Sequence, residues 1–283
     1  MALPDGFDLD DFVTRTFAED LGAGGDVTSK ATIPADRRFT AQMNARQAIV
    51  VAGLEIAAAF FRRLDPKVGI ELLASDGDPV EHRATLMRLD GSARAMLTAE
   101  RSALNTLQHL SGVATMTRQY VEAIAGTGAI LLDTRKTIPG LRLLEKYAAR
   151  MGGAQNHRMR LDDGVLIKDN HVAACGGVAE AVTRAKAANT GLQVQVEVDR
   201  IDQIEPALAA GADRLLLDNM PPHVLREAVA LVARRVPLEA SGGVTLETIR
   251  EIAETGVDYI SVGRITQSAP AVDVGLDYSV VIH

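Results

Sequence analysis

The sequence predicts an α/β protein in which an α+β N-terminal part is followed by a run of βα units. Beyond Gly126, short apolar runs recur, and each is followed by polar residues and then by a helical stretch, as expected of repeated βα units. Before Gly126, extended apolar segments are separated by turn signals such as Asp76-Gly77-Asp78-Pro79. This change of pattern indicates two domains.

The N-terminal part is expected to contain a surface-docked helix and two strand regions. Residues 9–21 place apolar side chains at near-helical spacing, with acidic residues at the start. Residues 40–52 and 81–97 are predicted to be extended, with turns at Asp76–Pro79 and at Asp90-Gly91. An α+β domain follows from these elements.

The C-terminal part is expected to alternate strands with amphipathic helices. A long helix leads into it, with Thr98 as its candidate N-cap and Gly126 as its stop. Right-handed βα units of this kind form either a barrel or an open doubly wound sheet. Helices are predicted at 178–189, 201–210, 223–235 and 246–255. Strands are predicted at 129–132, 165–167, 192–198, 214–217, 237–240 and 259–262.

Composition excludes several classes of function. The chain has 283 residues, 47% of them hydrophobic, and a net charge of −7, which argues against general adhesion to nucleic acid or to an anionic membrane. No apolar stretch is long enough for a signal peptide or a membrane span. Cys175 is the lone cysteine, which fits a reducing compartment, so the cytoplasm is the expected location.

Polar residues follow each of the predicted C-terminal strands. In a βα barrel the carboxyl ends of the strands form the active-site face. A single Asp or Ser after a strand is more often the N-cap of the next helix, so only the whole set is informative. The set is Asp133-Thr134-Arg135-Lys136, Lys168-Asp169-Asn170-His171, Glu197-Val198-Asp199, Asp218-Asn219, Ser241-Gly242-Gly243 and Gly263-Arg264.

A basic cluster, defined as Arg135, Lys136, His157, Arg158 and Lys168, indicates an anionic ligand. Surface cations usually only solvate a face, but three of these follow strands and the other two lie in the glycine-rich connection between them. Their mutual repulsion would be unfavourable without a counter-anion. Guanidinium groups bind carboxylates bidentately and lysines suit phosphates, so the mixed set favours a ligand that carries both.

Carboxylates and glycines extend the predicted site. Glu197 and Asp218 could hold Mg²⁺ or ribose hydroxyls beside a diphosphate, or could be counter-ions to the lysines. The pair Gly242-Gly243, before a helix predicted to open at Thr245, could offer backbone N–H groups to an anion, although such pairs often only form turns. Phosphate sites recur in the last two loops of this barrel, which favours Ser241 to Gly243 and the loop at Gly263.

Long, ordered stretches of the chain match one family. They are EDLGAGGDVTS (19–29), ERSALNTLQHLSGVAT (100–115), LLDTRKTIPGLRLLEKYAARMGG (131–153), NHRMRLDDGVLIKDNH (156–171), VEVD (196–199), LLLDN (215–219) and EASGG (239–243). In this order they resemble the quinolinate phosphoribosyltransferases, also called nicotinate-nucleotide pyrophosphorylases (carboxylating). Nearly the whole chain takes part in the resemblance.

The resemblance implies both architecture and activity. It implies an N-terminal α/β sandwich domain over residues 1–112, with the tail 270–283 packing back on it, and an incomplete TIM-like α/β barrel over 113–269. Quinolinate and 5-phosphoribosyl 1-diphosphate would react to give nicotinate mononucleotide, diphosphate and CO2, with Mg²⁺ required. A homodimer with shared active sites is implied, with a hexamer left open. Neither nucleic acid nor a membrane is an expected partner.

Roles are carried over residue by residue. Lys136 would meet the phosphoribosyl donor, and with Glu197 and Asp218, on the ribose and metal side, it forms the expected catalytic set. The quinolinate carboxylates would be gripped by Arg135, His157, Arg158 and Lys168, with Arg101 from the partner chain. Further expected substrate contacts are Thr134, Ser241, Gly242, Gly243 and Gly263, the last four at the 5-phosphate, and Gln267. Gln267 is a departure, because the family commonly has Thr-His-Ser where this chain has Thr266-Gln267-Ser268.

Two other readings of the residues are possible. Lys168 at a strand end could be the Schiff-base lysine of an aldolase-like lyase, although that chemistry does not explain the Arg/His set. A related protein could instead have kept the barrel as a non-catalytic anion-binding or molybdate-associated protein. The presence of Lys136, Glu197 and Asp218 favours catalysis.

Overall fold

Residues 3–280 are described by the computed structural model, and they fall into two units. The N-terminal unit comprises the chain up to Met116, the segment Leu143–Gly152 and the segment from Ala269 onward. The barrel unit comprises Thr117–Arg142 and Gly153–Ser268. Leu143–Gly152 therefore groups with the N-terminal unit although it lies within residues 113–269.

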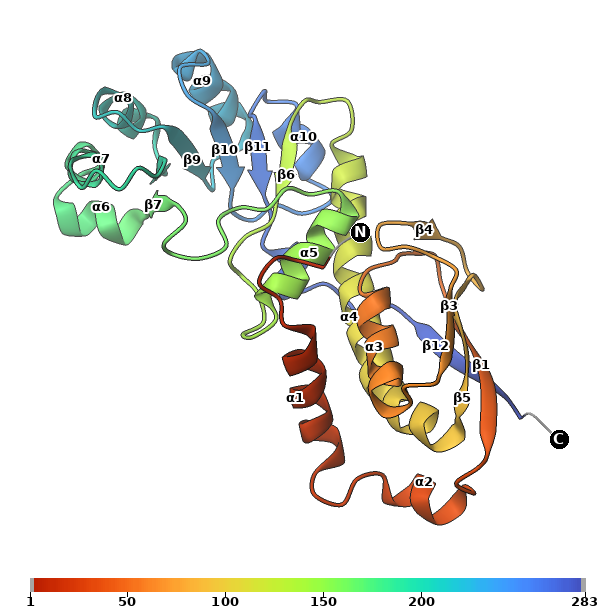
Figure 1. Cartoon of the computed structure of the whole chain (residues 1–283). Helices are drawn as coiled ribbons and strands as arrows, with labels where there is room; N and C mark the ends of the chain where they lie inside the picture. The colour runs from red at the N-terminus through yellow and green to blue at the C-terminus, as the bar shows by residue number, and fades with distance from the viewer. Residues whose placement is uncertain (1–2, 281–283) are drawn as a thin grey trace. The chain divides into compact units, whose positions relative to one another are not determined.

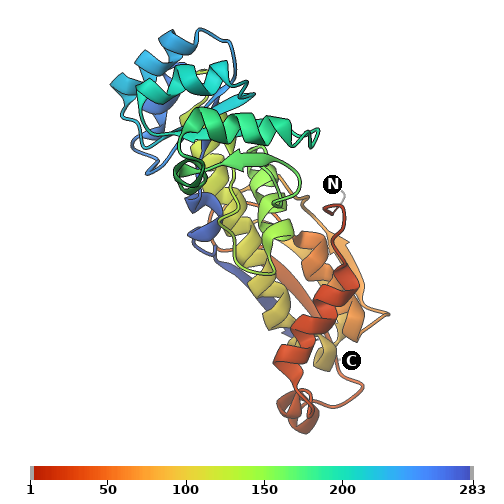
Figure 2. The ribbon, with the colours of Figure 1, turned by 90° about the vertical axis from the view of Figure 1, so that its left-hand side faces the viewer.

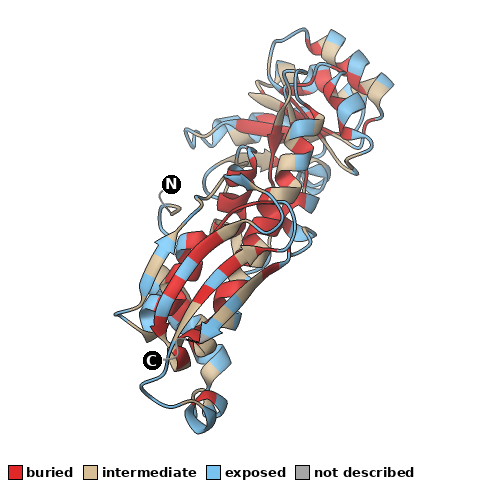
Figure 3. Cartoon of the chain, turned by 90° about the vertical axis from the view of Figure 1, so that its right-hand side faces the viewer, coloured by how far each residue is buried: buried red, intermediate tan, exposed pale blue. Residues whose placement is uncertain are grey.

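An antiparallel sheet forms the centre of the N-terminal unit. Its strands are β1 (Arg38–Ala45), β3 (Gly69–Leu72), β5 (Thr85–Ser92) and β12 (Val274–Val280), in the order β12-β1-β5-β3 (Figure 1). Successive side chains of a strand point to opposite faces, and Figure 3 shows the resulting alternation of buried and exposed residues. The short strands β2 (Ile49–Val50) and β4 (Pro79–Val80) pair separately.

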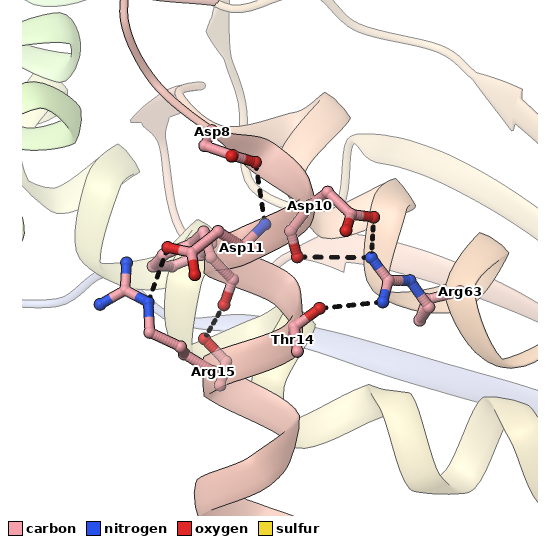
Figure 4. A network of polar contacts seen from close by, with 8 residues as sticks. Asp8, Asp10, Asp11, Thr14, Arg15 and Arg63 are labelled. Atoms are coloured by element: carbon pink, nitrogen blue, oxygen red, sulfur yellow. Dashed lines mark hydrogen bonds and ion pairs between the residues drawn. The ribbon is translucent and has the colours of Figure 1, made fainter.

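Helices of the N-terminal unit are α1 (Leu9–Leu21), α2 (Val27–Thr32), α3 (Leu54–Leu64), α5 (Arg142–Gly152) and most of α4 (Ala93–Ala123). The prediction for 9–21 is confirmed: Asp8 caps α1 by accepting from the Asp11 N–H. Phe12 and Phe17 of α1 pack edge-on against Phe60 of α3. Figure 4 shows the polar margin of this packing, where Arg63 binds Asp10 and Thr14.

Several boundaries in this unit differ from the prediction. The region 40–52 holds two strands, because pairing with β5 ends at Asn44 and pairing with β12 ends at Ala45. Asp90-Gly91 forms no turn but lies inside β5, opposite Thr40 and Phe39. Thr98 is not an N-cap: the helix already begins at Ala93, and the Thr98 hydroxyl donates to the Arg94 carbonyl one turn earlier.

A parallel sheet forms the barrel unit and confirms the predicted fold class. Its strands are β6 (Ile130–Leu132), β7 (Val165–Ile167), β8 (Val194–Val198), β9 (Arg214–Asp218), β10 (Leu238–Ser241) and β11 (Tyr259–Ser261). The order is β6-β11-β10-β9-β8-β7, and every pairing is parallel. Over the described residues β6 and β7 are the two edges, with only a bridge from Leu132 to Gln155 beyond β6, so the barrel is incomplete.

Helices alternate with these strands as the sequence predicts. They are α6 (Asp169–Cys175), α7 (Val178–Ala187), α8 (Ile204–Ala209) after the 3-10 turn Ile201–Gln203, α9 (Pro222–Val232), α10 (Ile249–Ala253) and α11 (Arg264–Gln267). Figures 1 and 2 show α7, α8 and α9 side by side along one face of the sheet. The helix expected to open at Thr245 begins instead at Ile249, after a turn closed by the Thr248 N–H and the Thr245 carbonyl. Among the described residues, none of the helices has the length and apolar character needed to cross a membrane.

Candidate active site

A cavity of about 750 Å³ opens at the carboxyl ends of the strands of the barrel unit. Because all six strands are parallel, their polar end residues meet at this edge of the sheet. The structure thereby brings together almost every residue that the sequence assigned to the site. These are Thr134, Arg135, Lys136, His157, Arg158, Lys168, Glu197, Asp218, Ser241, Gly242, Gly243, Gly263 and Gln267.

Arg101 is the one predicted site residue outside this set. It lies on α4 in the N-terminal unit, and its side chain is exposed. Arg101 is expected to contact quinolinate in the active site of a partner chain, so its role stays a prediction.

Two guanidinium groups converge on one part of the cavity. Arg158 donates from Nη1 to the Gly164 carbonyl at 2.8 Å, while the buried Nε of Arg135 has no hydrogen-bond partner. Burial lowers the pKa of Arg158, and the neighbouring charge of Arg135 lowers it further. An anion beside these two cations would relieve their mutual repulsion, so this part of the cavity is a candidate anion site.

A buried carboxylate positions the loop that carries His157 and Arg158. Asp133 is 0% exposed at the end of β6, and its Oδ1 accepts the His157 backbone N–H at 2.8 Å. Its Oδ2 accepts from the Asn156 side chain at 2.5 Å. The His157 ring is oriented further by the Arg158 N–H, which donates to Nδ1 at 2.8 Å. The loop is therefore held before any ligand binds.

Lys168 and Glu197 face each other at the ends of β7 and β8, with Nζ and Oε2 3.7 Å apart. Burial raises the pKa of Glu197, Lys168 opposes that rise, and the nearby Asp218 and Asp169 add to it. The Lys168 backbone N–H is fixed by His171 Nδ1 at 2.9 Å. The lysine side chain itself is half-exposed, at 51%, so it is free to reach a ligand.

Asp218 is held by a residue in the left-handed backbone conformation. Asn219 has φ +53°, which is uncommon for a non-glycine residue, and its Nδ2 donates to Asp218 Oδ2 at 2.7 Å. Gly242 approaches so closely that a Cβ there would lie 2.2 Å from Asn219 Oδ1. At φ +95° and next to that amide, only glycine fits at 242.

Lys136 crosses the mouth of the last loop. A Cβ on Gly263 would lie 2.7 Å from the Lys136 Cδ, so the absence of a side chain at 263 gives the lysine its path. The Thr266 hydroxyl donates to the Lys136 carbonyl at 2.7 Å, and the Lys136 N–H donates to Thr134 Oγ1 at 3.0 Å. Gln267 lies exposed on α11 at the same side.

The residues present are compatible with Mg²⁺ bound through its substrate. Glu197 and Asp218 supply carboxylate oxygens, the ligands that Mg²⁺ prefers. Over the described part of the chain no group of three or more His, Cys, Asp or Glu side chains could hold a metal ion. Such a pair fits an ion that keeps several waters and is held mainly by phosphates.

Comparison with known families shows which proteins this chain is similar to. Residues 26–111 match the model of the quinolinate phosphoribosyl transferase N-terminal domain, and residues 113–277 match that of the C-terminal domain. The chain belongs to the quinolinate phosphoribosyltransferase family.

Individual relatives of this quinolinate phosphoribosyltransferase family member cover nearly its whole length. It is 43% identical to the nicotinate-nucleotide pyrophosphorylase [carboxylating] of Mycobacterium leprae, over 94% of this chain and 96% of that one. It is 42% identical to the probable enzyme of that name from Bacillus subtilis, over 95% and 93%. A solved nicotinate-nucleotide pyrophosphorylase from Francisella tularensis superposes with a TM-score of 0.92 at 40% identity, covering 99% of this chain and 100% of that one.

Several residues that line the cavity were given no role by the sequence prediction. Asp169, Asn219, Glu239, Thr245 and Arg264 also line the cavity. Asp169, Asn219 and Arg264 stood in the strand-end set but received no role. Glu239 carried one overlooked signal, because it is an acidic residue between Leu238 and Ala240 in an apolar strand. Such a residue must be buried with partners.

Proposed function

We propose that the chain transfers the phosphoribosyl group of 5-phosphoribosyl 1-diphosphate to quinolinate, with loss of CO2, to give nicotinate mononucleotide and diphosphate. The observation that carries the proposal is the composition of one cavity. Paired guanidinium groups lie in it with Lys136, Lys168, two carboxylates and two glycine-bearing loops. Curated relatives about 40% identical are named for this activity, which supplies a step of de novo NAD biosynthesis.

Quinolinate is assigned to the guanidinium side of the cavity. Its two carboxylates match the two cations Arg135 and Arg158, with His157 and Lys168 completing the contact. The phosphoribosyl donor is assigned to the other side. There the backbone of Gly242, Gly243 and Gly263 can approach a 5-phosphate, together with the side chains of Ser241, Arg264 and Gln267.

The two carboxylates at the ends of β8 and β9 act on the transition state. As the pyridine nitrogen displaces diphosphate at ribose C1, positive charge grows on the sugar. Glu197 and Asp218 stabilise that charge, and Lys136 offsets the charge of the departing diphosphate. Orientation of two anions side by side in the cavity supplies a further part of the rate.

Loss of CO2 follows formation of the ring-nitrogen bond. The positively charged pyridinium nitrogen stabilises the electron pair left on ring carbon 2 when the bond to the carboxyl carbon breaks and CO2 departs. That carbon then takes a proton from water, so no organic cofactor is needed. When bound, Mg²⁺ would neutralise diphosphate charge, and Glu197 and Asp218 are the residues that would hold it.

An aldolase-like role for Lys168 is less well supported. A Schiff-base lysine needs an apolar pocket or a cationic neighbour that depresses its pKa. Lys168 is half-exposed and faces the carboxylate of Glu197 instead. The geometry suits ligand binding better than covalent catalysis.

Assembly and location complete the proposal. We propose a homodimer whose active sites are shared, with Arg101 contributed by the partner chain, and a cytoplasmic location. The exposed position of Arg101 on α4 supports its contribution to a partner chain. The lone cysteine supports the cytoplasmic location.

The activity is tested by mixing the purified protein with Mg²⁺, 5-phosphoribosyl 1-diphosphate and either quinolinate or nicotinate. Nicotinate mononucleotide is expected from quinolinate alone, together with an equal amount of CO2. Lys136→Gln should abolish product, whereas Arg160→Gln, at an exposed arginine paired with Asp162, should not. Product from nicotinate but not from quinolinate would contradict the proposal.

A further inference from the structure

A buried polar network lies beneath the basic cluster, centred on Glu239 of β10. Its carboxyl is 0% exposed and accepts from Gln195 Nε2 at 2.8 Å. Arg214 Nη2 lies 2.8 Å from the same Oε2, and the Arg214 guanidinium stacks on the Tyr259 ring at 3.9 Å. These partners come from β8, β9 and β11, so the network crosses the sheet.

His157 is the member of this network that reaches the cavity. Its Nε2 lies 3.4 Å from Glu239 Oε2, and its side chain is only 12% exposed. The other ring nitrogen, Nδ1, accepts the Arg158 backbone N–H at 2.8 Å. Both nitrogens of the ring therefore have defined neighbours of opposite kind, a donor at Nδ1 and an acceptor at Nε2.

We propose that Glu239 is a positioning residue that, with the Arg158 N–H, holds His157 as the neutral imidazole protonated on Nε2. A proton on Nδ1 would face the Arg158 N–H, and two donors 2.8 Å apart repel. The ring proton must then sit on Nε2, where a carboxylate accepts it. The amide of Gln195 and the guanidinium of Arg214 keep that carboxylate in place.

Glu239 stays charged under working conditions. Burial raises the pKa of its carboxyl, whereas the hydrogen bonds of the His157 ring and the Ser261 hydroxyl and the charge of the Arg214 guanidinium lower it. The Gln195 amide and the Arg214 guanidinium, each 2.8 Å from Oε2, thus favour the carboxylate form that accepts the His157 proton. No other carboxylate approaches the His157 ring within ion-pair distance among the described residues.

This inference rests on the proposed function for its consequence. With His157 neutral, the positive charge that meets quinolinate comes mainly from Arg135 and Arg158, since the charge of Lys168 faces Glu197. His157 instead donates one directed hydrogen bond from Nε2, which at 3.4 Å from Glu239 is loosely enough held to be shared with a substrate carboxylate. His157 thus contributes a hydrogen bond that depends on the position of the substrate carboxylate, and it contributes no positive charge.

The tautomer is measured on the unaltered free protein, independently of any activity. Long-range ¹⁵N–¹H spectra of the ¹⁵N-labelled chain report the protonation of each imidazole nitrogen, and His157→Asn identifies the signals of His157 among the six histidines. At neutral pH we expect an unprotonated Nδ1 and a protonated Nε2. Protonation of Nδ1, alone or with Nε2, would overturn the proposal.

The functional link is measured by a double-mutant cycle on the KM for quinolinate. Loss of one directed hydrogen bond should make Glu239→Gln raise that KM about tenfold, with a smaller change in kcat. In the His157→Asn background the same substitution should add less than about twofold, since Glu239 acts through His157. Equal effects in both backgrounds would overturn the link.

Folding of each variant is checked by near-ultraviolet circular dichroism. If Glu239→Gln does not fold, the tautomer in the unaltered protein decides the proposal. If no pyridine carboxylate is turned over at all, the proposed function fails while the tautomer still decides the role of Glu239. The two failures are therefore distinguishable.

Discussion

Gly242→Ala should destabilise the barrel unit by two separable effects. At φ +95° a Cβ is strained, at a cost of about 1–2 kcal/mol. The new methyl would also lie 2.2 Å from Asn219 Oδ1, so the amide must move and lose its 2.7 Å bond to Asp218, at a cost of about 1 kcal/mol. Together these effects should lower the free energy of unfolding by about 2–3 kcal/mol.

Gly243→Ala is the matched control for this substitution. Gly243 also has a positive φ, +61°, but a Cβ there would meet nothing closer than Asn219 Oδ1 at 4.0 Å. Its cost should be the strain alone, about 1 kcal/mol. The assay is urea unfolding of both variants, followed by the KM for 5-phosphoribosyl 1-diphosphate. Equal losses of stability in the two variants would refute the assigned contact between Gly242 and Asn219.

Three further predictions concern charge in the cavity. Glu197→Gln should lower kcat about 100-fold or more. Because the pKa of Glu197 is raised in the folded state, ionisation of this carboxyl destabilises the fold as pH rises through that pKa. Glu197→Gln should therefore unfold at a higher urea concentration than the unaltered protein at neutral pH, but not in acid. The reverse order would count against a desolvated carboxylate. Arg158→Ala should raise the KM for quinolinate about 10- to 100-fold in steady-state assays, while the exposed control Arg160→Ala changes it less than about twofold. Arg264→Gln should raise the KM for the phosphoribosyl donor about fivefold and leave that for quinolinate unchanged, and an effect on quinolinate alone would place Arg264 on the wrong side of the cavity.

Strands of the barrel unit could be predicted because each is a short apolar run between polar ends. The run 165–167 coincides with β7, and 259–262 exceeds β11 by one residue. Prediction failed where tertiary contacts decide the conformation. Asp90-Gly91 has the local sequence of a turn, yet it lies in a strand because β1 and β3 flank it on both sides.

Helix starts were harder to predict than strands for a related reason. Thr98 has the side chain of an N-cap, but its hydroxyl bonds to Arg94 and to Asp26, a residue far away in the sequence. The turn from Thr245 to Thr248 likewise delays α10, since Thr248 Oγ1 accepts the Thr245 N–H. Local preference cannot distinguish a cap from a turn that closes on itself.

The strand-end residues that line the cavity could be predicted from the sequence, whereas the buried network around Glu239 beneath them could not. Strand-end residues meet in any parallel sheet, so the alternation of strands and helices along the chain was enough to bring Arg135, Lys136 and Lys168 together, whereas His157 and Arg158 lie in the connection before β7. Glu239 and Arg214 are partners only because β9 and β10 are neighbours in the sheet, and Gln195 joins them from β8. The sequence does not state that order. A lone acid in an apolar strand is the signal that such a network exists, but it does not identify the partners.

The balance of charge in the cavity separates cations that are already neutralised from those that await a ligand. Lys168 faces Glu197, and Arg214 faces Glu239. Among the described residues the Arg135 guanidinium forms no ion pair, and that of Arg158 bonds only to the Gly164 carbonyl. If His157 is neutral, Arg135 and Arg158 are the two cations that this chain supplies to the pyridine side without an ion-pair partner among the described residues. A dicarboxylate would cancel both charges and a monocarboxylate would leave one, so we expect electrostatics alone to favour quinolinate over nicotinate.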